Sequence, residues 1–116
     1  MKAEEWNAIY FFSAAEFEEP EKMDVELVTM LSEARRHSGI PFKLTSTYRD
    51  GDPKTHGMGK GVDIRCSQSR PRFRILKGLI LAGFNRIGIY DKHIHADVGT
   101  EDEGFDVEVT WMGKSK

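Results

Sequence analysis

The chain has 116 residues, of which 39% are hydrophobic and 31% charged, and its formal net charge is −2. This length predicts a single domain, residues 1–116, with its packed core at about 12–112. A net charge of −2, with acidic and basic residues mixed along the chain, argues against a nucleic-acid partner. No apolar run approaches the roughly 20 residues of a membrane span. The single cysteine, Cys66, excludes an intrachain disulfide.

The first third of the chain predicts helices. Ser13 and Glu16 have the spacing of a capping box, so a short helical turn should follow Ser13. Asp24 is the expected N-cap of a longer helix over residues 25–38, which Gly39 ends in a left-handed conformation. The apolar positions expected to face the core are Val25, Leu27, Val28, Leu31 and Ala34.

Two alternating segments, residues 42–47 and 62–66, are typical of strands. In the second, Val62, Ile64 and Cys66 share one face, so Asp63 points to the opposite face. We therefore interpret Cys66 as a small buried hydrophobe rather than a metal ligand. A loop at 50–53 and a glycine-rich turn at 57–61 connect the two strands.

A second helix should begin at Ser69 or Arg70 and end before Gly83. Its expected packing face comprises Phe73, Leu76, Leu79, Ile80 and Phe84. Strands at 86–90 and 93–98 flank Asp91-Lys92, a spacing that suits a tight hairpin. A last strand is expected over 105–111, followed by a frayed tail at 114–116. Together these elements predict an α+β domain, with helices on one face of a small antiparallel sheet and a cleft on the other.

Three of the four histidines fall in two segments, 56–63 and 93–97. Imidazoles and a carboxylate are the ligands of catalytic zinc, which takes three protein ligands and leaves one position open. His56, Asp63 and His95 supply such a set from the open side of the predicted sheet. Zinc held this way lowers the pKa of a coordinated water to near neutrality. His93 shares the strand face of His95, about 6.6 Å away, too far to share the metal easily. The alternative is a loop histidine, a strand-edge acid and a pair of exposed histidines without a metal.

These residues resemble a known family, the zinc D-Ala-D-Ala carboxypeptidases and the related phage L-alanyl-D-glutamate endopeptidases, with the hedgehog/DD-peptidase fold. Its signature, Ser-x-His-x-x-Gly-x-Ala-x-Asp followed by His-x-His, is matched at His56, Gly59, Asp63 and the segment 93–95, with Gly61 in place of alanine. Residues 45–49, Thr-Ser-Thr-Tyr-Arg, resemble the family's Thr-Ser-Gly-Tyr-Arg, and residues 12–17 resemble its Phe-x-x-x-Glu-Phe.

The resemblance implies zinc on His56, Asp63 and His95, and it gives Arg49 the task of binding a substrate carboxylate or the developing oxyanion. The alternative for Arg49 is a surface ion pair with Asp50 or Asp52.

Two departures from the family pattern stand out. Lys54 replaces the serine of the signature, and Lys92 stands where some relatives carry the acid that serves as general base. His93 is then the candidate for proton transfer, and Asp91 is the alternative.

The resemblance implies a zinc metallopeptidase, a hydrolase that cuts an amide bond in the peptidoglycan stem peptide, either as a carboxypeptidase or as an endolysin-type endopeptidase. We expect a monomer with no nucleic-acid or membrane partner. We also expect synthesis in the cytoplasm without a signal peptide and a separate release route to the cell wall. The competing hypothesis is a non-catalytic zinc-binding recognition or structural module on the same fold, which Lys92 favours.

Overall fold

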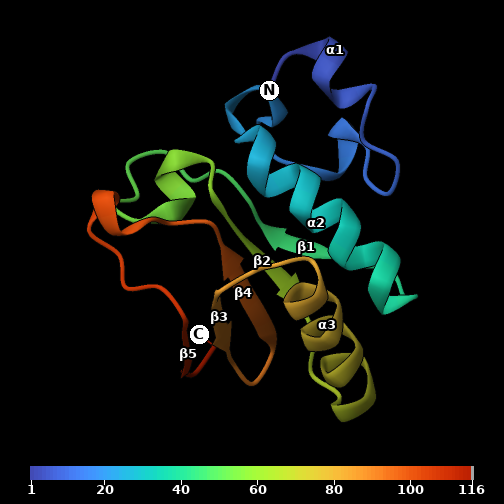
Figure 1. Cartoon of the computed structure of the whole chain (residues 1–116), viewed down its shortest axis with the longest axis vertical. Coiled ribbons are helices and arrows are strands. Elements are labelled where there is room, and N and C mark those ends of the chain that lie inside the picture. The colour runs from blue at the N-terminus through green and yellow to red at the C-terminus, as the bar shows by residue number, and fades with distance from the viewer. Residues whose placement is uncertain (116) are drawn as a thin grey trace.

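The computed structural model describes residues 1–115, and within them the chain forms an α+β domain of three α-helices and one five-stranded sheet (Figure 1). The helices are α1 (Ala3–Trp6), α2 (Val25–Ser38) and α3 (Ser69–Leu81), and the strands are β1 (Leu44–Ser46), β2 (Gly61–Arg65), β3 (Arg86–Ile89), β4 (His93–Asp97) and β5 (Val109–Met112). Four short 3-10 turns complete it: η1 (Ala14–Glu16), η2 (Pro20–Lys22), η3 (Thr55–Met58) and η4 (Glu101–Glu103). None of the described helices is long and apolar enough to span a bilayer.

The predicted start and stop signals are confirmed at α2. The side chain of Asp24 accepts a hydrogen bond from the Leu27 amide at 3.1 Å, and Gly39 ends the helix in the left-handed region at φ 72°. Of the expected capping box, the bond from the Ser13 amide to Oε2 of Glu16 forms at 2.9 Å, and the turn that follows is the 3-10 turn η1. At the start of α2, Val25 is 45% exposed rather than packed against the core as expected.

The sheet has the order β1-β2-β4-β3-β5, and its first three pairings are antiparallel as expected. The last strand differs from the prediction: it begins at Val109 rather than at 105, and it pairs parallel to β3. Both edges of β4 are taken by β2 and β3, so the last strand does not pair with β4 and instead adds at the free edge of β3. A strand that returns antiparallel to β4 is necessarily parallel to β3.

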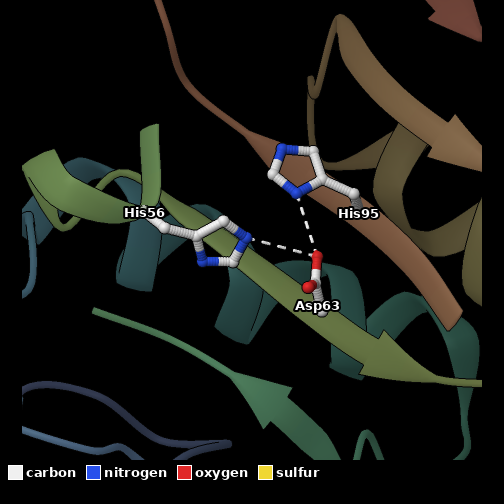
Figure 2. A group of neighbouring side chains, drawn as sticks. All are labelled: His56, Asp63 and His95. Carbon is white, nitrogen blue, oxygen red and sulfur yellow. Dashed lines mark hydrogen bonds and ion pairs between the residues drawn. The ribbon is translucent and has the colours of Figure 1, made fainter. Parts of the chain in front are cut away.

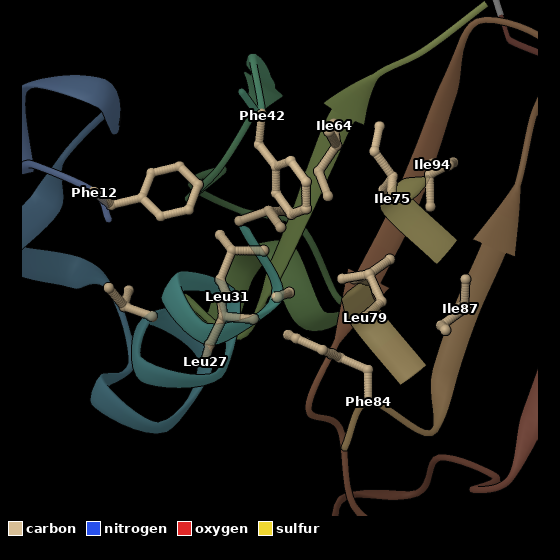
Figure 3. Packing of buried hydrophobic residues seen from close by; sticks show 14 of the residues in the cluster. Phe12, Leu27, Leu31, Phe42, Ile64, Ile75, Leu79, Phe84, Ile87 and Ile94 are labelled. Carbon is tan, nitrogen blue, oxygen red and sulfur yellow. The ribbon is translucent and has the colours of Figure 1, made fainter. Parts of the chain in front are cut away.

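Helices α2 and α3 pack against each other and cover one face of the sheet (Figure 3). Side chains from both helices meet the strand residues that alternate inward; the labelled ones are Leu27, Leu31, Ile75, Leu79, Ile64, Ile87 and Ile94. Residues before 12 contribute as well, since Met1, Trp6 and Ile9 pack against this core. Asp63, His93 and His95 lie on the opposite face of the sheet.

The predicted packing face of α3 is wrong in part. Ile75, Gly78 and Leu79 are buried, whereas Phe73 and Ile80 are 68% and 63% exposed. The close approach of the two helices explains the difference, because a Cβ at position 78 would overlap the carbonyl oxygen of Ala34 in α2. The helix therefore turns its smallest residue toward α2, and two large apolar residues face outward.

Gly78→Ala should lower the free energy of unfolding by about 1–3 kcal/mol, the usual cost of overpacking a tight contact. The obstacle is backbone rather than a flexible side-chain tip, so it outweighs the helix propensity of alanine, about 1 kcal/mol better than that of glycine. Urea denaturation measures the change. Lys77→Ala, at an exposed position on the same helix, should stay within about 0.5 kcal/mol of wild type. Equal stability of Gly78→Ala and wild type would contradict the close α2–α3 packing.

Candidate metal centre

His56 is held in the short turn η3, where it is buried. Its Nδ1 lies 2.7 Å from the carbonyl oxygen of Thr47. Because a carbonyl only accepts, Nδ1 carries the proton, and Nε2 is left as a free lone pair. That Nε2 lies 3.3 Å from Oδ1 of Asp63. The local fold thus selects the tautomer that a metal ligand requires.

Asp63 and His95 are direct partners across β2 and β4. Both point away from the helices, as the alternation of the two strands predicted, and Nδ1 of His95 lies 3.0 Å from Oδ1 of Asp63. Figure 2 shows the two imidazoles converging on this one carboxylate oxygen. Gly61 stands where the motif has alanine, and steric crowding explains the glycine. A Cβ at this position would come within 2.6 Å of Thr55 Oγ1 and 3.1 Å of His95 Cε1.

The far nitrogen of His95 is also fixed. Its Nε2 lies 2.6 Å from Oδ2 of Asp97, a carboxylate that is only 1% exposed. Asp97 is held in turn by Arg86 Nε at 2.6 Å, by the Gly99 amide at 3.0 Å and by Thr55 Oγ1 at 3.3 Å. A carboxylate behind a histidine is the usual support of a metal-bound imidazole, because it sets the tautomer and the ring orientation.

The ionisation states follow from these contacts. Burial alone would raise the pKa of Asp63, but the neighbouring imidazoles of His56 and His95 outweigh it and hold that pKa far below its ordinary range. Burial opposes charge on His95, yet hydrogen bonds to Asp63 and Asp97 raise its pKa. At Asp97 the effect of burial is likewise overcome by His95 and Arg86, and its pKa is lowered. In the absence of a metal, the two carboxylates therefore stabilise a proton on the ring between them.

One ligand atom from each of His56, Asp63 and His95 lies within 4.8 Å of the other two, so this group can hold a metal ion. His56 and His95 are buried and Asp63 is half-buried. The donor set is two imidazole nitrogens and one carboxylate oxygen, with outer partners that leave both nitrogens facing the same point. The chemistry of the donors thus fits a transition-metal ion.

The group opens into a cleft of about 870 Å³ on the face of the sheet opposite the helices. Strand residues and the loop before β5 line it, among them Tyr90, His93, Phe105 and Trp111. The expected cleft is therefore present on the open side. Its size falls within the roughly 300–1,000 Å³ of sites that bind small ligands and short peptides.

Arg49 lies at the edge of this cleft and is about half exposed, at 52%. Its Nη2 is 3.6 Å from Oδ2 of Asp63 and 2.7 Å from Ser46 Oγ, and its Nη1 is 3.2 Å from Asp52. Both interpretations of Arg49 thus have a geometric basis, because the guanidinium pairs with Asp52 and also adjoins the candidate ligands. Asp50 instead accepts a hydrogen bond from the Tyr48 hydroxyl.

His93 and Asp91 occupy different places. The predicted hairpin forms, with a hydrogen bond of 3.0 Å from the Tyr90 amide to the His93 carbonyl. His93 lines the cleft, and its Nε2 is 3.9 Å from Oδ1 of Asp63. The Asp91 carboxylate is exposed at the hairpin tip, where it accepts a hydrogen bond of 2.6 Å from the Ser115 amide.

The structure adds residues that the sequence pattern did not bring to the site. Tyr90 stacks on His93 with ring centroids 4.2 Å apart, and its hydroxyl accepts a hydrogen bond of 3.0 Å from Trp111 Nε1. The tail expected to be frayed is bonded to the hairpin as far as Ser115, while Lys116 lies outside the described residues. The sequence placed one aromatic residue, Tyr90 or Trp111, in each of two predicted strands. No local sequence pattern indicates that these two strands, β3 and β5, pair with each other.

Comparison of the chain with protein-family models, with curated proteins and with solved structures gives no match. The resemblance noted above therefore rests on the sequence motifs alone.

Proposed function

We propose that the protein is a zinc-dependent hydrolase that cleaves an amide bond in the stem peptide of peptidoglycan. The observation that carries the proposal is the convergence of His56 Nε2, Asp63 Oδ1 and His95 Nδ1 at the floor of an open cleft. Two imidazole nitrogens favour zinc over calcium or magnesium, which take oxygen ligands. A zinc ion held there would supply Lewis-acid activation of water and of the scissile carbonyl.

The chain's own residues have separable tasks in this proposal. Arg49 offers a half-exposed guanidinium beside Asp63, suited to a substrate carboxylate or to the negative charge that develops on the carbonyl oxygen. His93 projects into the cleft next to the ligands, where it can contact the reacting group of a bound substrate. Thr47, Asp97 and Arg86 hold the two ligand imidazoles from behind.

The peptidoglycan substrate is supported by the sequence resemblance, whose pieces have different structural positions. Three of them, at 45–49, 56–63 and 93–95, meet at the cleft. The fourth, at 12–17, belongs to the core, where Phe12 and Phe17 are both 5% exposed. The site motifs and the core motif thus occur in one fold, in the order that the family has them.

The test is digestion of purified peptidoglycan, followed by mass spectrometry of the muropeptides. Zinc-loaded protein should release D-alanine or split the L-alanyl-D-glutamate bond, while chelator-treated protein and the Asp63→Ala variant should not. The mass lost from each fragment identifies the bond. Unchanged muropeptides at high concentrations of zinc-loaded protein would refute the proposal.

The second candidate is a zinc-binding recognition module without catalysis. It is favoured by Lys92, an exposed cation at the position where some relatives carry an acid. A single-turnover assay separates the two functions. Peptidoglycan fragments that bind the zinc-loaded protein and are recovered intact would support the recognition module.

Arg49→Ala should keep its metal and its fold but lose about 10²–10³-fold in hydrolytic rate, the usual value of one oxyanion-stabilising donor. The fold should survive because the side chain is half exposed and its partners Asp52 and Ser46 lie near the surface. Steady-state kinetics with metal analysis of the same sample measure both effects. Arg74→Ala, an exposed arginine on α3 outside the cleft, is the matched control. A loss of only two- or three-fold would remove Arg49 from the reaction.

A further inference from the structure

Ser115, in the tail after β5, is bonded to the β3–β4 hairpin at three points. Its amide donates to Asp91 Oδ1 at 2.6 Å, and its hydroxyl oxygen accepts from the Lys92 amide at 3.1 Å. The same oxygen lies 2.9 Å from Nδ1 of His93. Two residues before Ser115, the Gly113 amide donates to the Ile89 carbonyl at 3.0 Å. The segment that leads to Ser115 is therefore itself bonded to β3.

The hydroxyl oxygen of Ser115 accepts from the Lys92 amide, and its own hydrogen is free to donate. Among the described residues, the contact within hydrogen-bond distance that can take it is His93 Nδ1. An O–H that donates to Nδ1 requires that nitrogen to be unprotonated, and a neutral imidazole then carries its hydrogen on Nε2.

The ring is also fixed in orientation. Tyr90 stacks on it with an interplanar angle of 12°, and Trp111 in β5 holds the Tyr90 hydroxyl at 3.0 Å. A side chain at Gly113 would overlap the Tyr90 ring, so the tail can pass here only as glycine. With the ring plane set by Tyr90 and Nδ1 set by Ser115, Nε2 faces the candidate ligands, 3.9 Å from Asp63 Oδ1.

We propose that Ser115 is a positioning residue that holds neutral His93 as the Nε2–H tautomer, so that His93 presents a hydrogen-bond donor to the metal group. A nitrogen that already carries a hydrogen cannot accept a proton from substrate or water. His93 therefore acts by donating a hydrogen bond to an oxygen of the bound substrate, rather than as a general base. Only this last step rests on the proposed function; the tautomer does not depend on it.

The tautomer is tested without substrate, on the full chain in its metal-free form labelled with ¹⁵N-histidine. Two-bond ¹H–¹⁵N correlation spectra distinguish rings protonated on Nδ1, on Nε2 and on both nitrogens. We expect His93 of the wild type as pure Nε2–H with a hydrogen-bonded Nδ1. In Ser115→Ala the Nδ1 resonance should move toward that of a ring exchanging between tautomers, and Ser115→Thr should restore it. Ser67→Ala, which removes an exposed hydroxyl outside the cleft, should leave it unchanged.

A wild-type His93 protonated on Nδ1, or an Nδ1 resonance unaffected by Ser115→Ala, would overturn the inference. Turnover gives a second measurement. Ser115→Ala should lose about 10–100-fold in kcat, the usual effect of removing a group that hydrogen-bonds a functional histidine from behind. KM should change little, and Ser115→Thr should recover the rate. If the wild type cuts no peptidoglycan, the proposed function fails, and the spectra alone decide the role of Ser115.

Discussion

Replacing His56, Asp63 or His95 by alanine should remove the metal and reduce hydrolysis to the level of the metal-free protein. We expect about one zinc per wild-type chain, as an open three-ligand site implies, and close to none in each variant after gel filtration. The reason is geometric: the three ligand atoms converge within 4.8 Å, so two of them cannot enclose an ion alone. Plasma mass spectrometry of the purified protein gives the occupancy.

Two further variants serve as controls for this result. His37→Ala removes a histidine outside the cleft, in the last turn of α2, and should leave the zinc content unchanged. Asp97→Asn keeps all three ligands but loosens the support of His95, and should cost about 10–100-fold in metal affinity. Full occupancy in any one of the three alanine variants would take that residue out of the ligand set. Full occupancy in all three would place the metal elsewhere.

The side of the sheet on which the site residues lie was predictable, because it depends on a local rule. Strand side chains alternate, so Asp63 had to oppose Val62 and Ile64, and His95 had to oppose Ile94. The structure places all of these as expected. Asp63 and His95 are direct neighbours because of the register in which β2 pairs with β4. Neither segment's sequence determines that register by itself. The family resemblance supplied that link.

Where prediction failed, the deciding interaction was distant in sequence. Helix α3 carries large apolar residues on several sides, so its periodicity does not single out a packing face, and the fit of Gly78 against Ala34 decides it. The direction of β5 relative to its neighbour depends on which free edge of the sheet it joins. The tail is held in place by three contacts of Ser115 with the β3–β4 hairpin, more than 20 residues earlier in the chain. A local sequence pattern predicts none of these three interactions.

His93→Ala should retain zinc and lose about 10²–10⁴-fold in hydrolytic rate, the range typical of a lost acid–base or proton-donating group. Zinc should remain because His56, Asp63 and His95 are untouched, and His93 does not belong to the group within 4.8 Å. Steady-state kinetics on muropeptides, with metal analysis of the same sample, measure both quantities. Asp91→Asn is the matched control, since its exposed side chain would still accept the hydrogen bond from the Ser115 amide, and it should change little.

A second substitution at the same position separates the two ways in which His93 can act. Glutamine carries an N–H donor but cannot accept a proton at that nitrogen, so His93→Gln should recover part of the rate if His93 donates from Nε2. If His93 serves as a base, glutamine should be as inactive as alanine. An inactive Asp91→Asn beside a fully active His93→Ala would instead assign the reaction to the carboxylate at the hairpin tip. That outcome would require the hairpin to turn Asp91 away from Ser115 and into the cleft.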